Sequence, residues 1–97
     1  MNAKRRKNIS QAIAFINYAK GKLEEAKDIL ETCAGEEEEY RDNMPESLQE
    51  SEKAEKADEA VSNLEESTST IEEVVDELDN QISELENAIN SAESATE

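Results

Sequence analysis

The feature that most constrains this chain is an unbroken heptad repeat in its second half. Apolar or small residues recur at alternating steps of three and four: Ala54, Ala57, Val61, Leu64, Thr68, Ile71, Val75, Leu78, Ile82, Leu85, Ile89 and Ala92. Such steps place these side chains on one face of an α-helix. The repeat predicts a long helix over residues 51–93 that buries this face against another helix.

Acidity is the competing consideration. A net charge of −16, with 37% charged and 35% hydrophobic residues, also suits a disordered chain. A disordered acidic segment, however, has no reason to repeat Val, Ile and Leu at fixed intervals. The two Gly, single Pro and absent Trp suit long helices as well. We therefore expect one small, folded, all-α domain.

The first half carries a second heptad grid that only Glu37 interrupts. Its members are Ile9, Ala12, Ile16, Ala19, Leu23, Ala26, Leu30, Cys33, Glu37, Tyr40 and Met44. This grid predicts a helix over residues 8–42, with Ile13, Phe15 and Ile29 widening its apolar stripe. It also predicts that Cys33 is buried as a small apolar residue, in a reducing compartment.

Two glycines fall within the first predicted helix. Gly35 is able to end a helix as a left-handed cap. The heptad grid nevertheless continues beyond it to Tyr40 and Met44. We therefore expect the helix to pass through Gly21 and Gly35, at a cost of about 1 kcal/mol each relative to Ala.

Residues 43–50 carry the strong turn signal of the chain, within DNMPESLQES. Pro45 disfavours helical geometry at the residue before it. Ser47 or Ser51 is suited to cap the next helix, and the spacing of Ser47 and Glu50 matches a capping box. The chain is expected to reverse here, between a basic arm at residues 1–7 and a frayed end at 94–97.

The flanking charges indicate how the two helices pair. One flank of the second helix is acidic throughout, with Asp58, Glu65, Glu72, Asp79, Glu86 and Glu93. Antiparallel pairing brings this flank to Lys20, Lys27 and Arg41, whereas a parallel pair of second helices forms no ion pair. The charges predict an antiparallel coiled-coil hairpin. A turn centred near residue 47 would place Leu30 opposite about Leu64 and Ile9 opposite about Leu85.

Two helices alone provide little core for a domain of this size. Four large apolar residues, Ile13, Phe15, Ile29 and Val74, lie outside the strict seam. We expect them to form a self-association surface, with Phe15, Ile29 and Val74 as its main residues. The predicted assembly is a homodimer, with two hairpins forming a helical bundle, or else a hairpin that docks obligatorily on a partner.

The residue inventory argues against catalysis and cofactors. The chain has no His and a single Cys, so nucleophile and base pairs have nothing to build on. Runs such as Glu36–Glu39 lack the ligand spacing of a calcium loop and are interpreted as solvated surface. We expect a protein that is not an enzyme and has no cofactor or metal.

The basic run Lys4–Lys7 is the one feature that favours a polyanion or an anionic membrane. Because the rest of the chain repels phosphate, it is interpreted as a solubilising arm or a clamp on the acidic helix. No stretch approaches the roughly 18 apolar residues of a membrane span. We expect a cytoplasmic protein with no direct nucleic-acid or membrane partner.

The best candidate for function is an acidic stripe on the second helix. It comprises Glu65, Glu66, Glu72, Glu73, Asp76, Glu77 and Asp79. Carboxylates in rows on a helical body are able to occupy a groove that normally binds a phosphate backbone. The alternative is that the stripe only keeps the protein soluble.

The segment EEYRDNMPESLQESEKAEKADEAVSNLEES, together with the KRRK start, resembles small acidic helical proteins encoded by bacteriophages and integrated elements. Residues 42–60 are the most distinctive part of the resemblance. Glu50 departs from it, because Gly is expected there. The resemblance implies a bacterial host cell and no enzymatic activity, and it transfers no functional residue.

Two functions remain open on the sequence. In the first, the acidic stripe inhibits or regulates a basic host protein that binds nucleic acid, by mimicking DNA, as in a counter-defence or anti-CRISPR role. In the second, the chain is a structural coiled-coil module of the element's own particle that docks through its apolar residues. A weaker third hypothesis is a DNA- or membrane-associated regulator that uses the basic arm.

Overall fold

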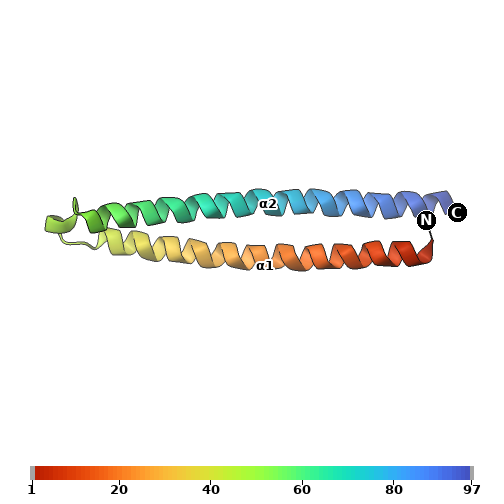
Figure 1. The fold of residues 1–97 in the computed structure, drawn as a ribbon, viewed down its shortest axis with the longest axis horizontal. Coiled ribbons are helices and arrows are strands. Elements are labelled where there is room, and N and C mark those ends of the chain that lie inside the picture. The colour runs from red at the N-terminus through yellow and green to blue at the C-terminus, as the bar shows by residue number, and fades with distance from the viewer. Residues whose placement is uncertain (1, 97) are drawn as a thin grey trace. The chain divides into compact units, whose positions relative to one another are not determined.

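The computed structural model describes residues 2–96, with the side chains of residues 2–91. Its elements are α1 (Ala3–Asp42), the 3-10 turn η1 (Glu46–Leu48) and α2 (Glu52–Thr96), shown in Figure 1. No strand occurs among the described residues. The two long helices pack against each other, so the predicted all-α hairpin is confirmed.

Helix α1 begins earlier than the sequence predicted. It starts at Ala3, so the basic run Lys4–Lys7 lies in its first turns instead of in a separate arm. Asn2 explains this start, because its side-chain Oδ1 accepts a hydrogen bond of 2.8 Å from the backbone N–H of Arg5. The helix continues through Gly21 and Gly35 without a break, as predicted.

Helix α2 begins at Glu52, one residue after the predicted start, and Ser51 caps it. The Ser51 hydroxyl oxygen accepts a hydrogen bond of 3.4 Å from the Ala54 backbone N–H. The helix extends to Thr96, beyond the predicted end at residue 93. The predicted frayed end at 94–97 has no described side chains, and its last residue lies outside the described residues.

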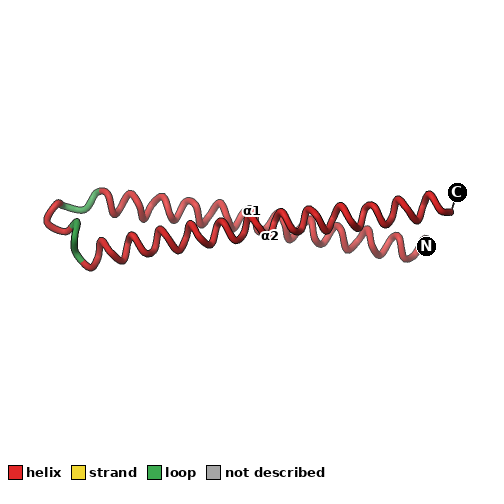
Figure 2. Tube along the Cα trace, turned by 90° about the horizontal axis from the view of Figure 1, so that it is seen from above, coloured by secondary structure: helices red, strands yellow, loops and turns green. Residues whose placement is uncertain are grey.

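The chain forms two compact units, and each is described separately. Unit 1 comprises Met1–Leu23 and Glu73–Glu97, and unit 2 comprises Glu24–Glu72. Each unit contains one stretch of α1 and one stretch of α2. Unit 2 also contains the turn, where Figure 2 shows η1 as a short helical piece between two loop segments.

The seam of α2 is the predicted one. Ala54, Ala57, Thr68 and Ile82 are buried. The half-buried members of the grid are Val61, Leu64, Ile71, Val75, Leu78, Leu85 and Ile89. The remaining member, Ala92, has no described side chain. The heptad prediction for α2 is therefore confirmed over all its described positions.

The seam of α1 was predicted wrongly at four of its positions. Ala12, Ala19, Cys33 and Tyr40 are exposed, and Cys33 is thus not the buried residue that was expected. Ala26 is half-buried, as the grid predicted. The least exposed side chains are instead spaced by four and three residues: Ile9, Ile13, Ile16, Lys20, Leu23, Lys27, Leu30, Ala34, Glu37 and Arg41. This stripe keeps half of the predicted grid and replaces the other half by the next residue along the helix.

The side chains at the buried positions explain why this stripe of α1 packs against α2. Ile13 offers more apolar surface than Ala12, and burial of apolar surface is the main stabilising term in such a seam. The aliphatic stems of Lys20, Lys27 and Arg41 cover α2 while their charged ends remain partly solvated. Helix α1 therefore turns these three basic residues into the seam.

The register between the helices also differs from the prediction. In unit 2, Lys27 pairs with Glu72 and Arg41 with Asp58, and in unit 1 Lys20 pairs with Asp79. In each pair the two residue numbers add up to 99. Leu30 therefore faces a position near Thr68 and not Leu64. The expected register, with Ile9 opposite Leu85, is wrong by about five positions.

The turn in unit 2 accounts for this shift. Met44 lies beyond the end of α1, yet it is buried together with Ala54 at the start of α2. The first turn of α2 therefore faces the loop and not the last turn of α1. The prediction centred the turn near residue 47, midway between the two helix ends, and did not allow for a loop that folds back on α2. This omission explains the error in the predicted register.

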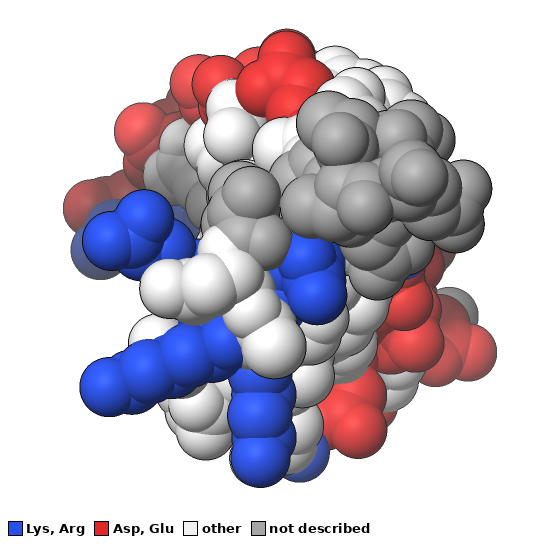
Figure 3. Space-filling model, turned by 90° about the vertical axis from the view of Figure 1, so that its right-hand side faces the viewer, with Lys and Arg blue, Asp and Glu red and all other residues white. Residues whose placement is uncertain are grey.

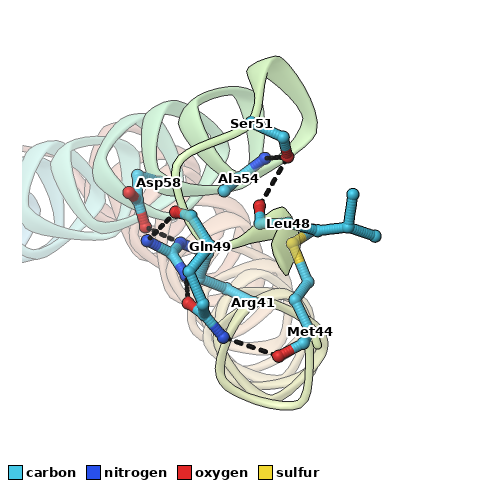
Figure 4. A network of polar contacts seen from close by, with 7 residues as sticks. All are labelled: Arg41, Met44, Leu48, Gln49, Ser51, Ala54 and Asp58. Carbon is cyan, nitrogen blue, oxygen red and sulfur yellow. Dashed lines mark hydrogen bonds and ion pairs between the residues drawn. The ribbon is translucent and has the colours of Figure 1, made fainter. Parts of the chain in front are cut away.

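Arg41 connects the end of α1 to this loop. It donates from Nε to Asp58 Oδ1 at 3.0 Å and from Nη2 to the Gln49 carbonyl oxygen at 3.0 Å. Its Nη1 donates to Gln49 Oε1, and Gln49 Nε2 donates to the Met44 carbonyl oxygen at 2.6 Å (Figure 4). This network holds the loop against both helices of unit 2.

Candidate functional site

The negative charge of the protein is concentrated in unit 2. Its residues 24–72 include four basic and eighteen acidic residues, a net charge of −14. The residues of unit 1 include six basic and eight acidic residues, a net charge of −2. Any partner selected by charge alone would therefore be attracted mainly to unit 2.

All seven residues of the predicted acidic stripe are exposed, and they are divided between the two units. Glu65, Glu66 and Glu72 belong to unit 2. The other four, Glu73, Asp76, Glu77 and Asp79, belong to unit 1. All seven lie on α2 and are accessible to solvent.

Two of the seven carboxylates have a structural role. Glu72 lies 2.7 Å from Lys27 Nζ, and Asp79 lies 2.6 Å from Lys20 Nζ. The Glu72 pair lies in unit 2 and the Asp79 pair in unit 1, and each joins α2 to α1, as the flanking charges predicted. The five carboxylates Glu65, Glu66, Glu73, Asp76 and Glu77 are therefore the better candidates for contact with a partner.

The Lys27 pair has a measurable signature at alkaline pH. The hydrogen bond to Glu72 raises the pKa of Lys27 above its ordinary value of 10.5, and nearby acidic charges add to the effect. A base whose pKa is higher in the folded state contributes stability below its unfolded pKa, and this is lost as pH rises through the folded pKa.

We expect this signature in a comparison with Lys27→Met. The difference in free energy of unfolding between the original protein and the variant should be constant up to about pH 10 and should decline above it. Denaturant titrations at several pH values measure this difference. A difference that stays constant up to pH 12 would show that the ion pair contributes nothing to stability.

Of the predicted self-association residues, Ile13 is wrong, because it is half-buried in the seam of α1, and the other three are exposed. Phe15, Ile29 and Val74 have exposed fractions of 66%, 63% and 39%. Sequence reasoning missed Tyr18 and Tyr40, which are equally open, at 69% and 51%. The spacing of Tyr18 three residues after Phe15 was the available signal.

The N-terminal stretch of α1 forms a basic face in unit 1. Lys4, Arg5 and Lys7 are exposed, and Lys and Arg side chains gather on one side of this end of the unit in Figure 3. Farther along, the Lys22 ammonium lies 5.5 Å from the centroid of the Tyr18 ring, which is a cation–π distance. Basic and aromatic groups thus occur together on α1.

Among the described residues, no group of three His, Cys, Asp or Glu side chains is arranged to hold a metal ion. No described helix is both long and apolar enough to cross a membrane.

Comparison with known proteins adds no assignment, because no family model, curated protein or solved structure matches the chain. The resemblance of residues 42–60 to phage-encoded acidic proteins stays a prediction.

Proposed function

We propose that this chain is a non-enzymatic interaction protein that binds a basic, nucleic-acid-binding partner through carboxylates of α2. The observation that carries this proposal is the exposure of Glu65, Glu66, Glu73, Asp76 and Glu77, whereas Glu72 and Asp79 are used in ion pairs with Lys27 and Lys20. These five carboxylates are not required to hold the helices together, so they are available to another protein.

The helical scaffold favours such a role. Side chains on a packed helix are held in a fixed direction by the seam below them, which lowers the ordering cost of binding. A basic groove shaped for a phosphate backbone presents Lys and Arg to any rigid row of negative charges, and releases counterions when it is filled. The binding is thus electrostatic and competes with nucleic acid.

The partner belongs to a bacterial host cell under this proposal. The motivation is the resemblance of the turn segment to proteins of bacteriophages and integrated elements. A mobile element gains from blocking host defences that act on nucleic acid, such as a CRISPR effector. Inhibition of such a protein in the cytoplasm is the biological role that we propose.

Neutralising the five carboxylates is the decisive experiment. Glu65, Glu66, Glu73 and Glu77 are changed to Gln, and Asp76 to Asn. The affinity for a purified basic partner, first captured from host lysate, should fall on the order of 100-fold while helicity measured by circular dichroism is retained. Duplex DNA or RNA should compete with the original protein for that partner.

A second variant with the same change of charge serves as the control. It carries five exposed substitutions to Gln elsewhere, at Glu38, Glu46, Glu50, Glu55 and Glu84. The proposal requires this variant to bind much more tightly than the first. Equal loss in both variants would show that net charge alone is recognised, and full binding by the first variant would refute the acidic face.

The alternative is a structural module that docks through apolar residues. The exposure of Phe15, Ile29 and Val74 favours it. In that case the carboxylate variant would bind normally, and changes to Ser at these three positions would abolish docking. The same assay therefore separates the two functions.

A further inference from the structure

In each of the two units, the described part of α1 exposes apolar side chains away from the seam. In unit 1, Ala12, Phe15 and Ala19 are exposed at steps of three and four residues. In unit 2, Ile29, Cys33 and Tyr40 are exposed at steps of four and seven. These are the spacings of a packing face on a helix, so α1 has a second face besides the seam that packs on α2.

The charge of α1 changes sign between the two units. Its stretch in unit 1, residues 3–23, has six basic residues, of which Lys20 is held in an ion pair with α2, and no acidic one. Its stretch in unit 2, residues 24–42, has nine acidic and two basic residues, and both basic residues are held in ion pairs with α2. The two stretches are thus complementary in charge, at +6 and −7, and both offer exposed apolar side chains.

We propose that a second copy of this chain covers this face, with the two α1 helices antiparallel. Each contact then joins the unit 1 stretch of one copy to the unit 2 stretch of the other, and two-fold symmetry repeats the contact. Lys4, Arg5 and Lys7 of one copy meet Glu36, Glu38 and Glu39 of its partner. A parallel pair would instead bring like charges together, which is destabilising.

Apolar burial supplies the stabilising part of this contact. Phe15 and Tyr18 are large side chains with most of their surface in solvent, and Ile29 and Tyr40 are their counterparts in unit 2. Small residues next to them, such as Ala12 and Ala19, allow a close approach of the second helix. Apolar side chains therefore lie at the centre of the proposed contact, and the charges determine the antiparallel direction of the two helices.

Variants with reversed charges at one end or the other of α1 test the antiparallel orientation of the two helices. The first variant carries Lys4, Arg5 and Lys7 changed to Glu, and the second carries Glu36, Glu38 and Glu39 changed to Lys. All six positions are exposed, and the new charges suit the respective ends of α1, so both variants should fold. Each variant alone should be monomeric in sedimentation experiments, and an equal mixture should form the dimer.

Other outcomes are equally informative. The original protein should be a dimer at about 100 µM, and its dissociation constant should rise roughly tenfold when salt is raised from low to physiological concentration. A monomer under these conditions, or a mixture of variants that stays monomeric, would overturn the proposal. Rapid oxidation to a dimer linked by two Cys33 residues would indicate the parallel arrangement and would overturn it as well.

The apolar component has its own control. Phe15→Ser with Ile29→Ser should raise the dissociation constant at least tenfold, whereas Leu48→Ser should leave it unchanged. Leu48 is also a large exposed apolar residue, but it lies in the turn. These measurements use the purified protein alone, so they are independent of the partner proposed above. Equal effects of the two changes would contradict a contact through α1.

Discussion

Replacing Ala54 by Asp is expected to destabilise unit 2 by about 3 kcal/mol or more, because a carboxylate would be buried without a partner. Ala54 is 1% exposed and lies at the start of α2, where Met44 is also buried. An Asp side chain is too short to reach solvent from this position. For a domain with a marginal core, such a loss removes most of the stability.

Thermal melting followed by circular dichroism measures this effect. The control is Ala14→Asp, the same chemical change at an exposed position of α1. Its cost should be limited to helix propensity, less than about 1 kcal/mol. Comparable melting temperatures for the two variants would mean that the turn does not hold Ala54 in a packed core.

Replacing both Lys20 and Lys27 by Leu is expected to stabilise the hairpin by about 1 to 2 kcal/mol. These lysines occupy seam positions of α1, and their side chains are 28% and 26% exposed. Leu buries more apolar surface there. Asp79 and Glu72 are about half exposed, so they remain solvated when their partners are removed.

The matched control changes Lys53 and Lys56 to Leu, which alters the net charge equally. Both are exposed, and the Lys56 side chain is 72% exposed. No gain is expected from this pair. If Lys20 and Lys27 instead contribute more through their charges than Leu does through burial, the first variant will melt at a lower temperature than the original protein.

The Ala54 substitution is expected to destabilise the protein and the two lysine substitutions to stabilise it, because these residues have different roles within one seam. Small residues such as Ala54 and Ala57 are almost fully buried, and close packing around a buried side chain does not favour a larger or charged group. Lysines occupy positions where apolar stems are tolerated but not optimal. Their ion pairs set the orientation and register of the helices more than they stabilise them, as is usual for partly exposed pairs.

Much of the hairpin could be predicted from the sequence. The heptads of α2 contain large apolar residues at nearly every repeat, so only one face is able to be the seam. Pro45 and the polar residues around it mark the reversal in the same local way. The acidic flank of α2 also identified Lys20, Lys27 and Arg41 as its partners, because charge complementarity needs only the order of residues along each helix.

The candidate surfaces were predicted less completely. The exposure of the acidic stripe and of Phe15, Ile29 and Val74 follows from their distance from the seam. The structural use of Glu72 and Asp79 within the stripe does not, because it depends on which lysine faces each carboxylate. The role of Gln49 in the turn was missed for the same reason, since two of its hydrogen bonds come from Arg41 at the end of α1.

The sequence by itself determined that α2 has one seam, that the chain reverses near Pro45 and that opposite charges face each other. Only the tertiary structure decided which of two neighbouring stripes of α1 is buried and how far the helices are displaced. Ala12 and Ile13, or Ala19 and Lys20, are adjacent on α1, and both choices continue the alternating steps. The buried stripe is the one whose side chains cover α2 and reach its acidic flank. This depends on the packed pair of helices and not on either helix alone.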